Sequence, residues 1–193
     1  MAITKKFFNK KITVYGLGKT GISAIKVLKK LGAKVYCWDD NIKARNKAKK
    51  SNYKISKFWN DGILYDKILI SPGINIYKNK KSIFFKKNSK KIITDLDLFF
   101  EKNKNAKIIS ITGTNGKSTT CKIIEKILKD AKLKPKVVGN IGNPILNSIK
   151  FKNVIYILEV SSYQLEYSKL IKSEHAAILN ISPDHLERHK NLK

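Results

Sequence analysis

Short apolar segments that favour strands alternate along the whole chain with longer segments of helical periodicity. The strand-like segments are rich in β-branched residues and cover 11–15, 33–38, 67–70, 107–112, 136–138, 154–160 and 176–181. In the helical segments apolar residues recur at three-residue steps, as Ile22, Ile25 and Leu28 do before a terminating Gly32. This alternation predicts an α/β fold of doubly wound parallel sheets, with ligands bound at the carboxyl ends of the strands.

A polar stretch at residues 102–106 separates a predicted helix over 95–102 from the next predicted strand. The chain has 193 residues, enough for two small domains. We therefore expect a Rossmann-like parallel-sheet domain over 1–104 and a second α/β domain over 105–193. The two cysteines, Cys37 and Cys121, lack the spacing of a metal site or disulfide framework and are expected to be small buried residues.

The formal charge is +27, from 41 Lys and Arg against 14 Asp and Glu. Such a charge suits a nucleic-acid-binding protein, which remains one alternative. However, only Arg45 and Arg188 are arginines, and the lysines are spread over the whole chain, which indicates a solvated surface of compositional origin. No nucleic-acid partner is expected. The sequence also has no apolar run of roughly 18 to 20 residues and no signal peptide, so we expect a cytoplasmic protein without membrane association.

The first predicted strand leads into a GxGxxG segment at 16–21 that directly precedes a helix. Glycines in this setting allow a tight turn, and free N–H groups at the helix start hold a diphosphate. An acid at the end of the second strand, Asp39 or Asp40, stands where a ribose or base contact is expected. Taken alone, these features fit an NAD-dependent dehydrogenase.

A second glycine-rich segment, 111–119, also lies between a strand and a helix and contains Gly-Lys-Ser. In loops of this type backbone N–H groups cradle phosphates, so Lys117 is expected to reach the β- and γ-oxygens and Ser118 or Thr119 to ligate Mg²⁺. Ile111 occupies the first glycine position of the usual pattern, which indicates a particular subclass of phosphate loop. This loop argues against a dehydrogenase.

Three further segments follow predicted strands of the second half. The turn 139–144 has glycines that permit close approach of a ligand, and is equally compatible with a plain loop. Glu159 ends an apolar strand beside the phosphate loop, where it can hold Mg²⁺ or pair with a lysine. In the last segment, 180–189, the histidine of the adjacent pair Asp184 and His185 could ligate a metal or position a substrate.

Six of these segments, in this order, resemble the Mur ligase family. They read GLGKTGIS at 16–23, SPGI at 71–74, ITGTNGKST at 111–119, GNIGNP at 139–144, LEVSSYQLE at 158–166 and NISPDHLERH at 180–189. The resemblance implies an ATP-dependent ligase of peptidoglycan precursor synthesis. Its first domain would bind a UDP-linked substrate, and residues 105–193 would be the amino-terminal part of a P-loop-type central ATP-binding domain.

The resemblance also implies roles for individual residues. Contacts to the UDP substrate are expected from Gly18, Lys19, Thr20, Asp39, Asp40, Ser71, Gly73, Asn140, Ser161 and Gln164. ATP contacts are expected from Gly113, Thr114, Asn115, Gly116, Lys117, Ser118 and Thr119. Mg²⁺ is expected at Ser118, Glu159 and His185, and catalytic roles are expected for Lys117 and His185.

The implied reaction adds D-glutamate to UDP-N-acetylmuramoyl-L-alanine through an acyl phosphate, with ATP and Mg²⁺. The chain ends soon after the last matching segment, before the family's third domain, so we expect substrate binding but no stand-alone turnover. A complementary carboxyl-terminal chain is then an expected partner. The alternatives are a non-catalytic module that binds UDP-sugar or ATP, and a ligase for another muramoyl-peptide step.

Overall fold

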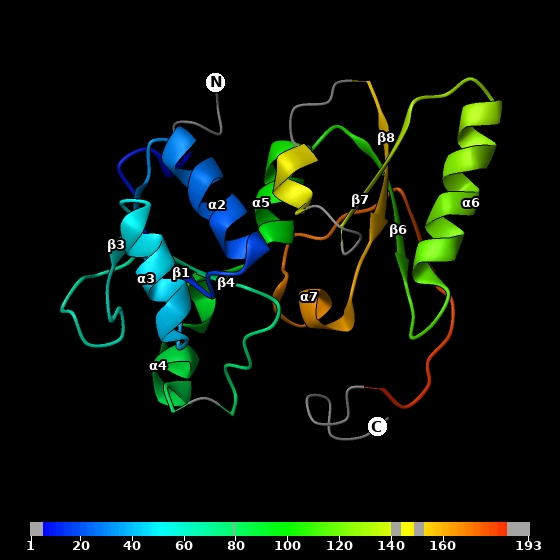
Figure 1. Ribbon diagram of the computed structural model, residues 1–193. Helices are drawn as coiled ribbons and strands as arrows, with labels where there is room; N and C mark the ends of the chain where they lie inside the picture. The colour runs from blue at the N-terminus through cyan, green and yellow to red at the C-terminus, as the bar shows by residue number, and fades with distance from the viewer. Residues whose placement is uncertain (1–5, 79, 140–143, 149–152, 185–193) are drawn as a thin grey trace.

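The computed structural model describes residues 6–78, 80–139, 144–148 and 153–184. Two parallel sheets lie side by side, with helices between and around them (Figure 1). The first sheet has the order β3-β2-β1-β4-β5. Its strands are β1 (Lys11–Tyr15), β2 (Lys34–Trp38), β3 (Lys54–Ile55), β4 (Lys67–Ile70) and β5 (Ile92–Ile93). They are connected through α2 (Lys19–Lys30), α3 (Ile42–Lys50), α4 (Ser82–Lys87) and the 3-10 turn η1 (Ser89–Lys91), and α5 (Asp95–Lys102) follows β5.

The second sheet has the order β7-β8-β6-β9, again with every neighbouring pair parallel. Its strands are β6 (Lys107–Thr112), β7 (Pro135–Gly139), β8 (Ile155–Glu159) and β9 (His175–Ile178). The helical elements of this half are α6 (Lys117–Asp130), the 3-10 turn η2 (Ile145–Ser148) and α7 (Ser162–Tyr167). The central strand β1 of the first sheet and the inner strand β6 of the second each run into a glycine-rich loop. Ligands bind at such positions in open α/β sheets.

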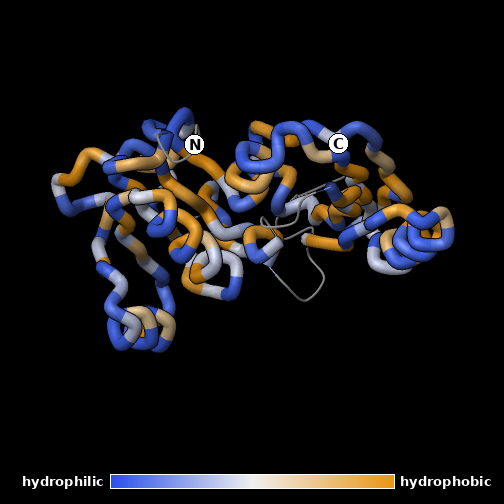
Figure 2. The backbone as a smooth tube through the Cα atoms, turned by 90° about the horizontal axis from the view of Figure 1, so that it is seen from above, coloured by the Kyte–Doolittle hydropathy of each residue, from blue (hydrophilic) through white to orange (hydrophobic). Residues whose placement is uncertain are grey.

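The strand and helix periodicities explain this arrangement. Strand β1 is buried along Ile12–Tyr15, as expected of a parallel strand covered on both faces. Helix α2 packs its buried side, including Ala24, Ile25 and Leu28, against the sheet. In Figure 2 hydrophobic stretches run through the middle of the first half, and the helical turns around them alternate between hydrophobic and hydrophilic residues. The predicted α/β class with parallel sheets is therefore confirmed.

One hydrophobic cluster extends across both halves, beside two further clusters among the described residues. Helix α5 and turn η2 lie between the sheets (Figure 1), and one buried cluster contains Leu28, Leu96, Phe99, Leu146 and Tyr156. The rings of Phe99 and Tyr156 meet edge to face, with centroids 5.1 Å apart. The change from one sheet to the other falls between α5 and β6, and a division into domains 1–104 and 105–193 stays a prediction.

Several elements differ from the sequence-based expectation. The two-residue strands β3 and β5 are too short to produce a recognisable alternation. Strand β9 is shifted relative to the predicted 176–181, and its four residues are exposed. Cys37 and Cys121 are buried and unpaired, as expected, and burial raises the pKa of each thiol to about 11. Within the described ranges, no helix has the length and hydropathy needed to cross a membrane.

Candidate functional site

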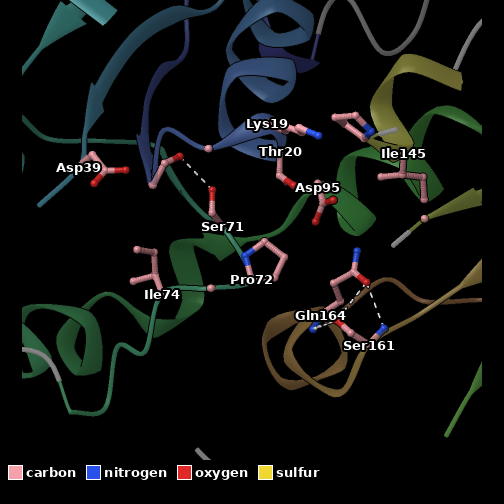
Figure 3. A pocket seen from close by; sticks show the side chains of 15 residues that line it. Lys19, Thr20, Asp39, Ser71, Pro72, Ile74, Asp95, Ile145, Ser161 and Gln164 are labelled. Carbon is pink, nitrogen blue, oxygen red and sulfur yellow. Dashed lines mark hydrogen bonds between the residues drawn. The ribbon is translucent and has the colours of Figure 1, made fainter. Parts of the chain in front are cut away.

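A cavity of about 480 Å³ opens between the two halves at the carboxyl ends of β1 and β4 (Figure 3). The first half contributes the turns after these strands, and the second half contributes the ends of β7 and β8 and the start of η2. The lining residues are Gly16, Gly18, Lys19, Thr20, Asp39, Ser71, Pro72, Gly73, Ile74, Asp95, Gly139, Pro144, Ile145, Ser161 and Gln164. Eight of the ten residues predicted to contact the UDP substrate therefore meet in one cavity.

The turn after β1 depends on its glycines. Gly16 has φ +98°, and a Cβ there would lie 2.7 Å from Cβ of Ser71. A Cβ on Gly21 would lie 1.8 Å from the carbonyl oxygen of Gly16, so α2 can approach β1 only without a side chain at this position. The Ser71 hydroxyl donates to that same carbonyl at 2.9 Å. The turns after β1 and β4 are thus locked together, and the N-terminus of α2 faces the cavity.

The N-terminus of α2 supplies the anion-binding character of the cavity. Gly18 is the N-cap residue and has no side chain to satisfy the first N–H groups of the helix. These groups, together with the positive end of the helix dipole, suit a diphosphate. Lys19 and Thr20, the first two residues of the helix, also line the cavity.

Asp39 and Asp40 have different surroundings. Asp39 lines the cavity and accepts hydrogen bonds from the backbone N–H of Leu17 at 2.6 Å and of Asn41 at 2.8 Å, so it also holds the first loop. Asp40 is not among the lining residues. It accepts hydrogen bonds from Trp38 Nε1 at 3.0 Å, from Lys81 Nζ at 2.8 Å, and from the Tyr15 hydroxyl.

These partners determine the ionisation of Asp40. Burial raises its pKa, but the hydrogen bonds from Lys81, Tyr15 and Trp38 outweigh that effect and lower the value to about 2. The structure therefore brings Asp39 to the cavity and engages Asp40 in a neighbouring polar cluster.

Ser161 and Gln164 reach the cavity from the start of α7 and form a capping box. Gln164 N–H donates to Ser161 Oγ at 3.3 Å, and Ser161 N–H donates to Gln164 Oε1 at 3.1 Å. This box fixes the orientation of the Gln164 amide and directs its nitrogen into the cavity (Figure 3). The three-residue spacing of Ser161 and Gln164 is the sequence signature of a capping box, so this feature can be recognised without the structure.

Asp95 is a cavity residue that the sequence analysis missed. It is the first residue of α5, and only 2% of it is exposed. Its Oδ1 has no hydrogen-bond partner among the described residues. Burial raises the pKa of this carboxyl to about 6, although the N–H of Leu96 and the Gln164 side chain act in the opposite direction. In the sequence Asp95 resembles an ordinary acid in the first turn of a helix, because nothing local reveals the cavity.

The second glycine-rich loop follows β6 and has the form of a phosphate cradle. Gly113 and Gly116 have φ of +145° and +82°. A Cβ on Gly113 would lie 3.1 Å from Leu179 Cβ, so the close approach of the β9 end requires glycine there. Lys117 Nζ donates to the carbonyl oxygens of Gly113 at 2.5 Å and of Thr114 at 2.8 Å, which folds the lysine over its own loop.

Asn180, beyond the end of β9, supports this loop and was also missed as a site residue. Its Oδ1 accepts from Asn115 N–H at 2.9 Å, and its Nδ2 donates to the Asn115 carbonyl at 3.0 Å. Its own carbonyl accepts from Thr114 N–H at 3.1 Å. The N–H groups of Thr114 and Asn115 are thus engaged, and the first N–H groups of α6, from Lys117 onward, remain available to a phosphate.

Glu159 and Ser118 meet at the mouth of this loop. The Ser118 hydroxyl donates to Glu159 Oε2 at 2.8 Å, and Glu159 is 3% exposed at the end of β8. Among the described residues Glu159 forms no ion pair, so the lysine-paired alternative is not what the structure shows. One buried carboxylate beside one hydroxyl suits Mg²⁺ that is completed by phosphate oxygens and water. Nowhere in the described ranges, this loop included, do three or more His, Cys, Asp or Glu side chains gather in a way that could hold a metal ion.

Two predicted site residues, Asn140 and His185, lie outside the described residues. Thr119 lies in the first turn of α6, next to Ser118. All other predicted residues belong to the cavity, to the phosphate loop, or to the polar cluster around Asp40.

The sequence matches two known family domains. Residues 10–93 match the Mur ligase MurD-like N-terminal domain, and residues 111–193 match the Mur ligase middle domain.

Curated relatives cover nearly the whole chain. The UDP-N-acetylmuramoylalanine--D-glutamate ligase of Wolbachia pipientis is 40% identical over 97% of this chain and 38% of its own length. The ligase of the same name from Rickettsia prowazekii is 44% identical over 94% of this chain and 41% of its own length. The chain thus spans about two-fifths of the length of these relatives.

Solved structures share the fold. A UDP-N-acetylmuramate-alanine ligase from Thermotoga maritima superposes with a TM-score of 0.52 at 22% identity, over 95% of this chain and 44% of its own. A UDP-N-acetylmuramate:L-alanyl-gamma-D-glutamyl-meso-diaminopimelate ligase from Neisseria meningitides superposes with a TM-score of 0.53 at 15% identity, over 95% of this chain and 64% of its own.

Proposed function

Because the chain belongs to the Mur ligase family, we propose that it forms the substrate-binding and nucleotide-binding parts of a ligase that joins D-glutamate to UDP-N-acetylmuramoyl-L-alanine. The choice of this step rests on the relatives, which carry the name UDP-N-acetylmuramoylalanine--D-glutamate ligase at 36% to 44% identity. The proposed overall reaction is ATP-dependent amide formation between the L-alanine carboxylate and the amine of D-glutamate.

The observation that supports this proposal most strongly is the relation between Glu159 and Ser161. Glu159 ends β8 and accepts the Ser118 hydroxyl of the phosphate loop. Ser161, two positions later, lines the cavity. A nucleotide on the phosphate loop and a ligand in the cavity would therefore approach one another at the end of one strand. Amide ligation needs this proximity, because the acid must reach the terminal phosphate.

Different groups of a UDP-linked acid would contact different residues along the cavity. The N–H groups at the start of α2, with Lys19 and Thr20, would hold the diphosphate. Asp39 would face the nucleoside end, and Ser161 and Gln164 would contact the muramoyl-alanine end. Asp40 would act indirectly, by holding Lys81 and Tyr15 beside the nucleoside end.

The phosphate loop suits ATP with Mg²⁺. Gly113–Thr119 would surround the triphosphate, and Ser118 and Glu159 would hold the metal together with His185. Bound Mg²⁺ would supply charge neutralisation, which lowers the repulsion between carboxylate and triphosphate. Lys117 would exchange its bonds to the Gly113 and Thr114 carbonyls for phosphate oxygens, and so position the terminal phosphate.

Calorimetric titration with three ligands tests the substrate assignment. We expect UDP-N-acetylmuramoyl-L-alanine to bind more tightly than UDP-N-acetylmuramate or a UDP-muramoyl dipeptide. Tighter binding of the UDP-muramoyl dipeptide would contradict the assignment and indicate another ligase step. Tighter binding of UDP-N-acetylmuramate would also contradict the assignment.

Turnover is tested separately. Phosphate release that depends on D-glutamate would be measured with this chain alone and with the carboxyl-terminal part of a relative added. Release in either sample supports the ligase assignment. Binding without release in both samples supports a non-catalytic nucleotide-binding module.

A further inference from the structure

Asp95 is the one cavity-lining carboxylate whose burial has no explanation within the described structure. It is nine-tenths or more buried, and its Oδ1 has no hydrogen-bond partner there. An unsatisfied buried polar atom is costly, and folded proteins retain few of them. Its neighbour Asp97 shows the usual solution, because its two oxygens accept bonds from the N–H groups of Thr94, Lys169 and Leu170.

The direction of the Asp95 side chain indicates what it meets. The carboxyl projects into the cavity between Thr20 and Gln164 (Figure 3). Thr20 lies at the diphosphate-binding start of α2, and Gln164 lies at the proposed muramoyl-alanine end. A carboxylate repels phosphate, so its partner must be a hydrogen-bond donor in the segment between the diphosphate and the acid. In a UDP-linked amino-sugar acid that segment is the amino sugar.

We propose that Asp95 Oδ1 accepts a hydrogen bond from a hydroxyl or amide N–H of the amino sugar of the bound UDP-linked substrate. This inference rests on the proposed function, since the order of groups along the ligand comes from it. Asp95 is then a binding residue that distinguishes UDP-linked amino sugars from UDP itself. The Gln164 amide, oriented by its capping box, positions the carboxyl from the opposite side.

The test compares three ligands on wild type, Asp95→Asn and Asp95→Leu. Affinities for UDP, UDP-N-acetylglucosamine and UDP-N-acetylmuramoyl-L-alanine would be measured by calorimetry. Loss of a hydrogen bond to a charged group lowers affinity by roughly 10- to 100-fold. We expect this loss in Asp95→Leu for the two amino-sugar ligands, and a smaller loss in Asp95→Asn, which keeps a neutral carbonyl acceptor. UDP affinity should change less than twofold in either variant.

Thr13→Val is a matched control. Thr13 Oγ1 is the other buried side-chain atom without a partner among the described residues, but Thr13 lies within β1 and does not line the cavity. Its replacement removes an unsatisfied polar atom without touching the ligand, so all three affinities should stay at the wild-type value. Thermal unfolding of each variant without ligand establishes that it is folded.

The outcomes separate the two proposals. Equal losses for UDP and the amino-sugar ligands, unchanged affinities, or a loss confined to UDP-N-acetylmuramoyl-L-alanine would each overturn the role of Asp95 and leave the proposed function standing. Failure of the wild-type protein to bind any UDP-linked amino sugar would overturn both.

Discussion

The Ser118 hydroxyl donates a hydrogen bond of 2.8 Å to Oε2 of Glu159, although the two residues are 41 positions apart in the chain. Parallel pairing of β6 with β8, in which Ile111 lies opposite Glu159, brings the two loops together. The register of the β6–β8 pair therefore places the Glu159 carboxylate beside the phosphate loop, although the two segments are far apart in the sequence.

Replacement of Glu159 is expected to remove the effect of Mg²⁺ on nucleotide binding. Glu159→Gln keeps an acceptor for the Ser118 hydroxyl but removes the charge that holds a divalent cation. We expect Mg²⁺ to increase ATP affinity at least tenfold in wild type and less than threefold in the variant, measured with a fluorescent ATP analogue. Glu125→Gln, on the surface of α6, is the control and should behave as wild type. An unchanged Mg²⁺ effect in Glu159→Gln would show that this residue is not a ligand.

Removal of the Asn180 side chain is expected to loosen the phosphate loop. Asn180→Ala deletes two hydrogen bonds to the backbone of Asn115, which should cost about 1–3 kcal/mol locally. Hydrogen exchange at the amide of Asn115 should accelerate, and ATP affinity should fall by roughly tenfold. Asn60→Ala, at an exposed position of the first half, should change neither quantity. Unaltered exchange at Asn115 would contradict the supporting role of Asn180.

Replacement of Asp97 is expected to weaken the connection between the two halves. Its Oδ1 accepts from Ser168 Oγ at 3.0 Å and from the N–H groups of Lys169 at 2.7 Å and Leu170 at 2.8 Å. Asp97→Ala leaves these donors unsatisfied, so the free energy of unfolding should fall by roughly 3 kcal/mol or more. Urea denaturation measures the loss, and hydrogen exchange should show deprotection of Lys169 and Leu170.

Asp130→Asn serves as the control for Asp97, because its carboxyl is exposed at the end of α6. A destabilisation of Asp97→Ala no larger than that of this control would mean that the bonds from the 168–170 segment contribute little.

The Asp95 carboxyl should make stability depend on pH. Burial raises its pKa from 3.8 to about 6, so the folded protein binds the proton more tightly than the unfolded chain. Its contribution to stability is complete below the unfolded pKa, falls as pH rises between these two values, and is constant above them. Asp95→Asn should therefore be more stable than wild type above this window, by an amount on the order of 3 kcal/mol, and nearly equal to it below.

Urea denaturation at several pH values across this window measures the difference between Asp95→Asn and wild type. In Thr13→Val the difference from wild type should not vary with pH, because no ionisable group is replaced. A variant Asp95→Asn that is less stable than wild type at neutral pH would indicate a structural role for the carboxyl.

Local sequence patterns were sufficient to predict much of the fold and the position of the phosphate loop. Strand alternation, helical spacing and the glycine positions each depend on residues close together in the chain. Strands β1 and β6 therefore have their predicted bounds, and α2 and α6 follow the two glycine-rich segments as expected. The two site residues that were not predicted from the sequence were missed for a physical reason. Asp95 and Asn180 act through residues far away in the sequence, and their local surroundings resemble an ordinary helix start and an ordinary loop.

The sequence by itself determined the α/β class, both glycine-rich loops and the resemblance of the chain to Mur ligases, because backbone conformation and side-chain periodicity are encoded over a few residues. Only the tertiary structure decided that Asp39 lines the cavity whereas Asp40 binds Lys81, and that Ser118 meets Glu159. It also decided that Asp95 is buried without a partner. These properties depend on sheet order, register and the packing of α5 between the sheets, which bring distant segments together and exclude water from their contacts.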